Sequence, residues 1–157
     1  MAKYNITEYK ESTSTYQDFI SPAVLDIMQT KVLEVLLIQK KYRLKGYTAQ
    51  MLAQELHSNT RYISAVCNVR FHMNYTTLVN KYRVEESMSI LVDRRYLKLT
   101  MEDVADMVGF ANRQSFYAAF YKQKGCTPRE YKMNYLKLHP ELQQEPKRPT
   151  KKSKDKK

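Results

Sequence analysis

The same arrangement of small and turn-forming residues occurs twice in this chain. Thr48 and Thr100 each begin a segment with helical spacing, followed five positions later by an alanine and nine positions later by a turn residue. The turn residue is His57 in the first copy and Gly109 in the second. A small residue lets two helices cross closely, and both turn residues tolerate positive φ better than most. The chain is therefore predicted to contain two helix-turn-helix units.

Capping signals and apolar spacing extend this pattern to the rest of the chain. Apolar residues recur at helical intervals after each capping signal, and no useful length alternates with a period of two. The fold class is therefore predicted to be all-α. The predicted elements are a helix from Ser21-Pro22 to Gly46, a first helix-turn-helix unit at about 48–70, a linker helix at about 76–94, a second unit at about 100–123 and a closing helix at about 128–138.

Composition divides the chain into three parts. Residues 1–22 form a polar N-terminal extension, predicted to be flexible, and residues 23–138 form the predicted domain. Residues 139–157 form a Lys-rich, proline-broken tail that is predicted to be disordered. The tail is either a solubilising end or an additional electrostatic hold on a polyanion.

Charge points to a polyanionic partner. The 27 basic residues outnumber the 16 acidic ones and give a net charge of +11. Residues 23–138 alone hold 18 basic and 10 acidic residues, so the excess does not depend on the tail. A strongly basic balance favours nucleic acid or another polyanion.

Several function classes lack their sequence signals. Two cysteines and three scattered histidines show no metal-ligand spacing, and no phosphate loop, nucleophile elbow or paired-carboxylate motif is present. We therefore expect no enzyme activity, no cofactor and no metal. No apolar run approaches a membrane span and no signal-peptide stretch opens the sequence, so we expect no membrane contact and a cytoplasmic location.

A compound pattern then identifies a family. Its parts are the run 80–87 (NKYRVEES), the helix and turn at 104–110 (VADMVGF), the segment 115–122 (SFYAAFYK) and the ending 125–131 (GCTPREY). Together they resemble the DNA-binding domain of AraC/XylS-type transcription regulators. The resemblance implies about seven helices, two recognition helices that enter neighbouring major-groove segments of double-stranded DNA, and RNA polymerase as a further partner. Larger members carry a sensory domain, and we expect no small-molecule effector domain in this chain.

The first recognition helix is predicted to read bases through its exposed face. Removing the apolar candidates leaves positions 61, 64, 65 and 68 on one face. The family's base-contacting positions map onto the same four residues. These are Arg61, Ser64, Ala65 and Asn68. Arginine can grip guanine bidentately, asparagine can pair with adenine, and serine can do either more weakly.

The second recognition helix and the DNA backbone complete the expected contacts. Arg113 and Gln114 are the predicted base readers there, and Tyr117 contacts either a base or the backbone. Helix N-termini and nearby cations suit phosphates. The predicted backbone contacts are Thr60, Arg70, Lys122, Lys124 and Thr127.

Two alanines depart from the family pattern. Relatives often carry arginine where this chain has Ala65 and Ala118. An alanine methyl can contact a thymine methyl, which would favour A·T pairs; the alternative is low specificity, or specificity supplied by a partner. We expect Ala65→Arg to raise DNA affinity. The rival functions are a protein-interaction module that has lost DNA reading, and a non-specific polyanion binder led by the tail.

Overall fold

The computed structural model describes residues 20–144, and within that range all regular structure is helical. The elements are α2 (Pro22–Leu33), the π-helical turn η1 (Glu34–Ile38), the 3-10 turn η2 (Lys41–Arg43), α3 (Ala49–Glu55), α4 (Thr60–Arg70), α5 (Tyr75–Leu91), η3 (Arg94–Tyr96), α6 (Met101–Val108), α7 (Arg113–Lys124), α8 (Pro128–Leu138) and η4 (Pro140–Gln143). The prediction of an all-α fold is confirmed. Among these helices none is long and apolar enough to cross a membrane.

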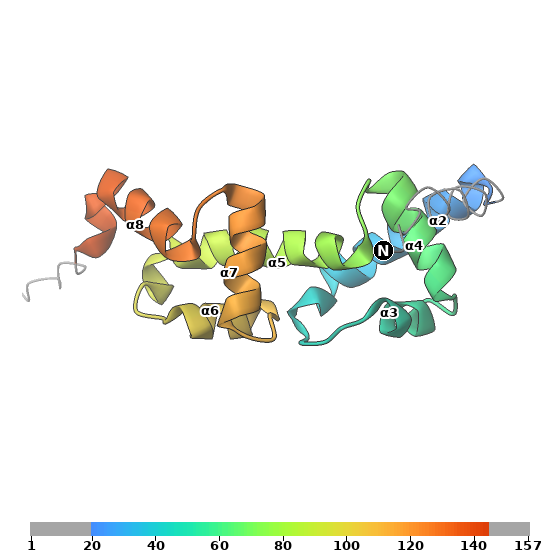
Figure 1. Ribbon diagram of the computed structural model, residues 1–157, viewed down its shortest axis with the longest axis horizontal. Coiled ribbons are helices and arrows are strands. Elements are labelled where there is room, and N and C mark those ends of the chain that lie inside the picture. The colour runs from blue at the N-terminus through green and yellow to red at the C-terminus, as the bar shows by residue number, and fades with distance from the viewer. Residues whose placement is uncertain (1–19, 145–157) are drawn as a thin grey trace, which may run out of the picture.

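The molecule is elongated, with α5 lying along its middle (Figure 1). Helices α2, α3 and α4 gather at one end of α5, and α6, α7 and α8 at the other. Helices α4 and α7 both run across the long direction of the molecule, and in the view of Figure 1 each begins at the lower edge and rises. The fold thus presents two similarly placed units on one continuous helix.

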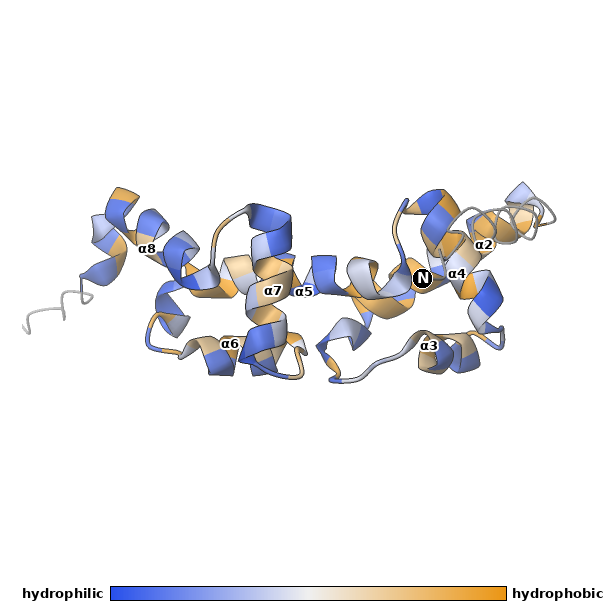
Figure 2. Ribbon diagram, in the orientation of Figure 1, coloured by the Kyte–Doolittle hydropathy of each residue, from blue (hydrophilic) through white to orange (hydrophobic). Residues whose placement is uncertain are grey.

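Each unit has its own hydrophobic core, and α5 contributes to both. Leu78 and Val79 belong to the first core, whereas Val84, Ile90 and Leu91 belong to the second. Both cores reach complete burial at their centres, for example at Leu52 and Phe116. Figure 2 shows the hydrophobic colouring of α7 in its middle, with hydrophilic colouring at both ends. Since burial of apolar surface stabilises each unit, the linker helix is held at both ends.

The first helix ends earlier than the sequence predicts. The α-helix is followed by a π-helical turn at Glu34–Ile38 and does not continue to Gly46. Lys40 has a left-handed backbone, with φ 52°. Apolar residues recur on both sides of the polar run 39–41, and no glycine or proline comes before Gly46, so the sequence predicts one long helix. A left-handed lysine is uncommon and has no sequence signal. The prediction of a helix over residues 39–46 is wrong.

The ordered structure continues past residue 138. A 3-10 turn covers Pro140–Gln143, and the Arg94 guanidinium donates a hydrogen bond to the Gln144 carbonyl. The segment predicted to be disordered from residue 139 therefore begins with six described residues. Residues 1–19 and 145–157, which hold most of the predicted extension and the rest of the predicted tail, lie outside the described range.

Candidate nucleic-acid interface

The two turns that precede α4 and α7 are built alike. Ser58 N donates to Ala53 O at 2.8 Å, and Phe110 N donates to Ala105 O at 3.0 Å. These bonds are the 6→1 contacts of a Schellman ending, which requires a left-handed residue at the turn. His57 (φ 52°) and Gly109 (φ 99°) supply it. The predicted turn role of both residues is confirmed.

The two alanines that the repeated spacing places where helices cross are both buried. Ala53 and Ala105 are 3% and 1% exposed, respectively. Their small side chains bring α3 and α6 close to the helices that follow them. Each turn therefore delivers the next helix at a defined angle.

Asparagine caps both helices at the point where base contacts are expected. Asn59 Oδ1 accepts from Tyr62 N at 3.1 Å, and Asn112 Oδ1 accepts from Ser115 N at 2.8 Å. Because each cap satisfies one orphan N–H, it fixes the first turn and the side chains that project from it. Arg61 lies in the first turn of α4, and Arg113 in that of α7.

Most of the predicted reading face of α4 is exposed. Arg61, Ser64 and Asn68 are exposed, and so is Thr60, the predicted backbone contact at the start of the helix. Ala65 is 1% exposed, so its prediction as a base-contacting residue is wrong. The helical projection places Ala65 between half-buried Tyr62 and exposed Arg61, and a single methyl there is too short to emerge. Ala65 therefore cannot favour a thymine methyl.

The predicted reading face of α7 is also exposed, with one qualification at Tyr117. Arg113, Gln114 and Ala118 are exposed, whereas Tyr117 is half-buried against the second core. The Arg113 guanidinium lies 4.9 Å from the Tyr117 ring centroid and donates to its hydroxyl at 3.3 Å. This hydrogen bond raises the pKa of Arg113. Tyr117 thus orients the arginine by a cation–π contact and a hydrogen bond.

The predicted backbone contacts fall into two groups. Lys122 and Lys124 are exposed in the last turn of α7. Thr127 instead caps α8 in a reciprocal box: its Oγ1 accepts from Glu130 N at 3.1 Å, and its N–H donates to Glu130 Oε2 at 3.0 Å. A phosphate at this helix end would meet the Glu130 carboxylate. We therefore do not assign Thr127 to phosphate binding.

Arg70 has a structural role that the sequence did not reveal. Its guanidinium lies 2.7 Å from Asp26 Oδ1 and donates to Gln29 Oε1 at 3.4 Å and to the Pro22 carbonyl at 3.3 Å. All three partners belong to α2. We therefore assign Arg70 to packing between α4 and α2 rather than to phosphate contact.

Arg70→Ala is expected to lower the free energy of unfolding by about 1 kcal/mol, because it removes a half-exposed ion pair and two hydrogen bonds. Urea denaturation of the full chain measures this effect. Arg129→Ala, which changes an exposed arginine on α8, is the matched control. A loss of DNA binding with unchanged stability would contradict the packing role.

Cys67 does not offer a reactive thiol. Cys67 is fully buried in the first core, and burial raises the pKa of its thiol to about 11. A covered, protonated thiol is a poor nucleophile. Among residues 20–144 no three His, Cys, Asp or Glu side chains converge to hold a metal ion.

Sequence reasoning missed the residues that join the two units. Arg83 lies in the run 80–87 that carries the family resemblance, yet it received no role. Its guanidinium donates to the carbonyls of Tyr42 and Leu44, which lie some forty positions earlier in the chain. No local pattern indicates partners at that separation.

Comparison with known proteins gives a consistent result. A family model described as a helix-turn-helix domain matches residues 52–134. The uncharacterized HTH-type transcriptional regulator YtdP of Bacillus subtilis (strain 168) is 27% identical over 85 residues. That alignment covers 54% of this chain, and the chain spans only 11% of the length of that relative.

Solved structures share the fold. The C-terminal domain of AraT, a response regulator from Geobacillus stearothermophilus, matches with a TM-score of 0.58 and 22% identity, covering 74% of this chain and 88% of that one. A DNA-binding transcriptional dual regulator from Escherichia coli K-12 matches with a TM-score of 0.58 and 20% identity, covering 70% and 93%. With the family model spanning both helix-turn-helix units and the linker helix between them, the chain belongs to the AraC-type helix-turn-helix domain family.

Proposed function

We propose that this chain binds double-stranded DNA as a sequence-specific transcription regulator. The N-terminal turns of α4 and α7 enter adjacent major-groove segments. The observation that carries this proposal is that two capped helices, α4 and α7, both begin on the lower side of the molecule in Figure 1. Each has an exposed arginine in its first turn, Arg61 in α4 and Arg113 in α7.

The exposed side chains have the chemistry for base reading. Arg61 and Arg113 can each donate two hydrogen bonds to guanine O6 and N7, and Asn68 and Gln114 can pair with adenine N6 and N7. Ser64 adds a short donor or acceptor on the α4 face. The two helices therefore offer different patterns of donors to two stretches of sequence.

Phosphate contacts supply affinity that does not depend on sequence. Thr60 at the start of α4 and Lys122 and Lys124 at the end of α7 are exposed and flank the reading faces. Each neutralised phosphate releases counterions, so binding should weaken steeply with salt. RNA polymerase, which the family implies as a partner, remains a separate proposal.

In vitro selection from random duplex DNA, followed by mobility shifts across a salt series, tests the proposal. We expect one enriched motif with two recognisable halves and a steep salt dependence. Absence of an enriched motif would contradict sequence-specific binding, and absence of any shift would favour a protein-interaction module. A chain truncated after Gln144 keeps every described residue and tests the tail. Near-total loss of binding by that truncation would favour a tail-led polyanion binder.

Ala118→Arg is expected to strengthen DNA binding by about 1 kcal/mol, because it adds a charged donor to the exposed face of α7. Ala65→Arg is the matched comparison, because the same change at a buried position crowds its neighbours. It should lower the free energy of unfolding by about 1–3 kcal/mol. If both variants are fully stable and gain the same affinity for DNA, the assignment of Ala118 as exposed and Ala65 as buried is contradicted.

A further inference from the structure

A short segment before the first helix-turn-helix unit crosses to the second unit. We call residues 40–46 the strap. It begins at left-handed Lys40, passes through the 3-10 turn Lys41–Arg43 and ends at Gly46 (φ 69°). The Tyr42 side chain is buried in the first core, and its ring centroid lies 6.2 Å from that of Tyr82 on α5. The strap is therefore anchored in the first unit.

The backbone of the strap lies directly against the turn of the second unit. A Cβ atom built on Gly109 would lie 2.3 Å from Tyr42 O and 2.7 Å from both Arg43 C and Arg43 O. These distances are too short for any side chain, so glycine is required here for close approach as well as for its φ of 99°. The turn that delivers α7 is thus in backbone contact with the strap.

Arg83 joins the strap, α5 and the second core. Its Nε donates to Tyr42 O at 2.7 Å, and its Nη2 donates to Leu44 O at 3.2 Å. Its guanidinium carbon lies 5.6 Å from the ring centroid of Phe110, the residue after Gly109. A planar guanidinium that serves two carbonyls and stacks on a ring cannot be replaced by lysine without loss.

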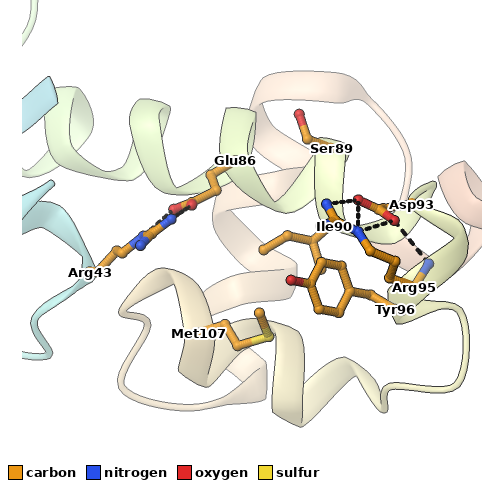
Figure 3. A pocket seen from close by; sticks show the side chains of 8 residues that line it. All are labelled: Arg43, Glu86, Ser89, Ile90, Asp93, Arg95, Tyr96 and Met107. Atoms are coloured by element: carbon orange, nitrogen blue, oxygen red, sulfur yellow. Dashed lines mark hydrogen bonds and ion pairs between the residues drawn. The ribbon is translucent and has the colours of Figure 1, made fainter. Parts of the chain in front are cut away.

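Two ion pairs add to the contact between the strap and helices α5 and α6. Arg43 forms a bidentate pair with Glu86 on α5, at one end of a hollow of about 380 Å³ (Figure 3). Lys45 Nζ lies 2.5 Å from Asp106 Oδ1 on α6. The Glu86 side chain is only 14% exposed, so its pair with Arg43 is partly shielded from water.

We infer that the strap locks the two helix-turn-helix units at one relative angle and distance, so that Gly109, Arg83 and the Arg43–Glu86 pair set the spacing of the two DNA half-sites. This inference rests on the proposed DNA binding. Among residues 20–144, α5 is the only helix that contributes to both cores. One helix by itself resists rotation of its two ends less well than a helix with a second connection beside it. The strap supplies that second connection. Its residues lie outside the reading faces of α4 and α7, so they act as positioning residues.

Two sets of variants test the lock. Gly109→Ala forces the strap away from the second turn, and Gly125→Ala is its control, because Gly125 has a similar φ of 72° at a helix end with nothing within 4 Å of an added Cβ. The double variant Arg43→Gln, Glu86→Gln removes both charges and the bidentate pair. Glutamine keeps the shape of Glu86, and at position 43 it is shorter than arginine. Arg95→Gln, which breaks an ion pair with Asp93 next to the same hollow, is its control.

The decisive measurement is affinity for selected DNA sites with zero, one or two base pairs inserted between the halves. The unaltered chain and both controls should lose about tenfold or more in affinity on insertion, because rigid helices cannot follow displaced half-sites. Gly109→Ala and the double variant should lose less than about threefold on insertion, while their affinity for the original site falls. A merely structural defect would weaken all spacings alike. The inference is overturned if the double variant loses as much affinity on insertion as the unaltered chain does. This outcome does not depend on whether Gly109→Ala folds.

Calorimetry without DNA separates this inference from the proposed function. The unaltered chain should unfold in one transition, and Gly109→Ala should unfold in two, because the cores are then coupled through α5 alone. If the unaltered chain binds no duplex, the proposed function fails, while this result still judges the lock. In that case the lock is also overturned if the unaltered chain, Gly109→Ala and the double variant each unfold in a single transition of the same width.

Discussion

Replacing Phe116 with alanine is expected to lower the free energy of unfolding by about 3–5 kcal/mol. Phe116 is fully buried at the centre of the second core. Its ring centroid lies 5.3 Å from that of Phe110 and 5.9 Å from that of Phe120. The truncation therefore removes the apolar area of one ring and leaves a cavity that its aromatic neighbours cannot fill.

Urea denaturation of the full chain measures the Phe116 effect. Tyr121→Ala is the control, since Tyr121 is 59% exposed on the same helix and should change stability by less than about 0.5 kcal/mol. Phe116→Leu, which refills part of the cavity, should fall between the two. Equal effects from Phe116→Ala and Tyr121→Ala would show that the second core does not depend on this ring.

Arg113→Ala is expected to weaken binding to the selected site by about 1–3 kcal/mol and to relax the preference at one base pair. The reason is that Arg113 supplies a bidentate donor that Tyr117 already holds in place, so little side-chain freedom is lost on binding. Competition with DNA variants at each position of the site measures the relaxed preference.

Two matched variants sharpen the Arg113 prediction. Lys122→Ala removes an exposed cation from the same helix and should weaken cognate and random DNA equally. Tyr117→Phe keeps the ring under Arg113 but removes the hydroxyl that accepts from it, so it should produce only part of the Arg113→Ala loss. Equal losses on cognate and random DNA for Arg113→Ala would contradict its role as a base reader.

The helix-turn-helix units could be predicted because their signals are local. The threonine caps, the alanines five positions later and the turn residues act within single turns of chain, and the left-handed His57 and Gly109 follow from them. Helical spacing also indicates one apolar face on each short helix, and Val66 and Val104 are buried on such faces.

The linker helix was harder to read because it has no single buried face. Leu78 and Val79 face one core, and Val84, Ile90 and Leu91 face another. The apolar positions of this helix therefore do not form one stripe.

The remaining errors concern contacts between distant segments. The sequence does not show that Arg70 pairs with Asp26, because the two residues are far apart in the chain. Ala65 is covered by larger neighbouring side chains, and helical spacing alone does not indicate how deeply they bury it. The strap was missed because no glycine or proline lies between Pro22 and Gly46, and the left-handed Lys40 carries no sequence signal of its own. A single sequence contains the partners of Arg83, but it contains no signal that pairs them.

The packing of α5 limits how the length of this helix can vary. Of its 17 residues only Thr76, Glu85 and Ser89 are exposed. An insertion of one residue would turn everything beyond it by about 100° and advance it by about 1.5 Å. An insertion between Val79 and Val84 would leave each set of buried side chains matched to its own core but would turn one unit relative to the other. The length of α5 therefore sets the relative orientation of the two units, and it can change less easily than the identity of the three exposed residues.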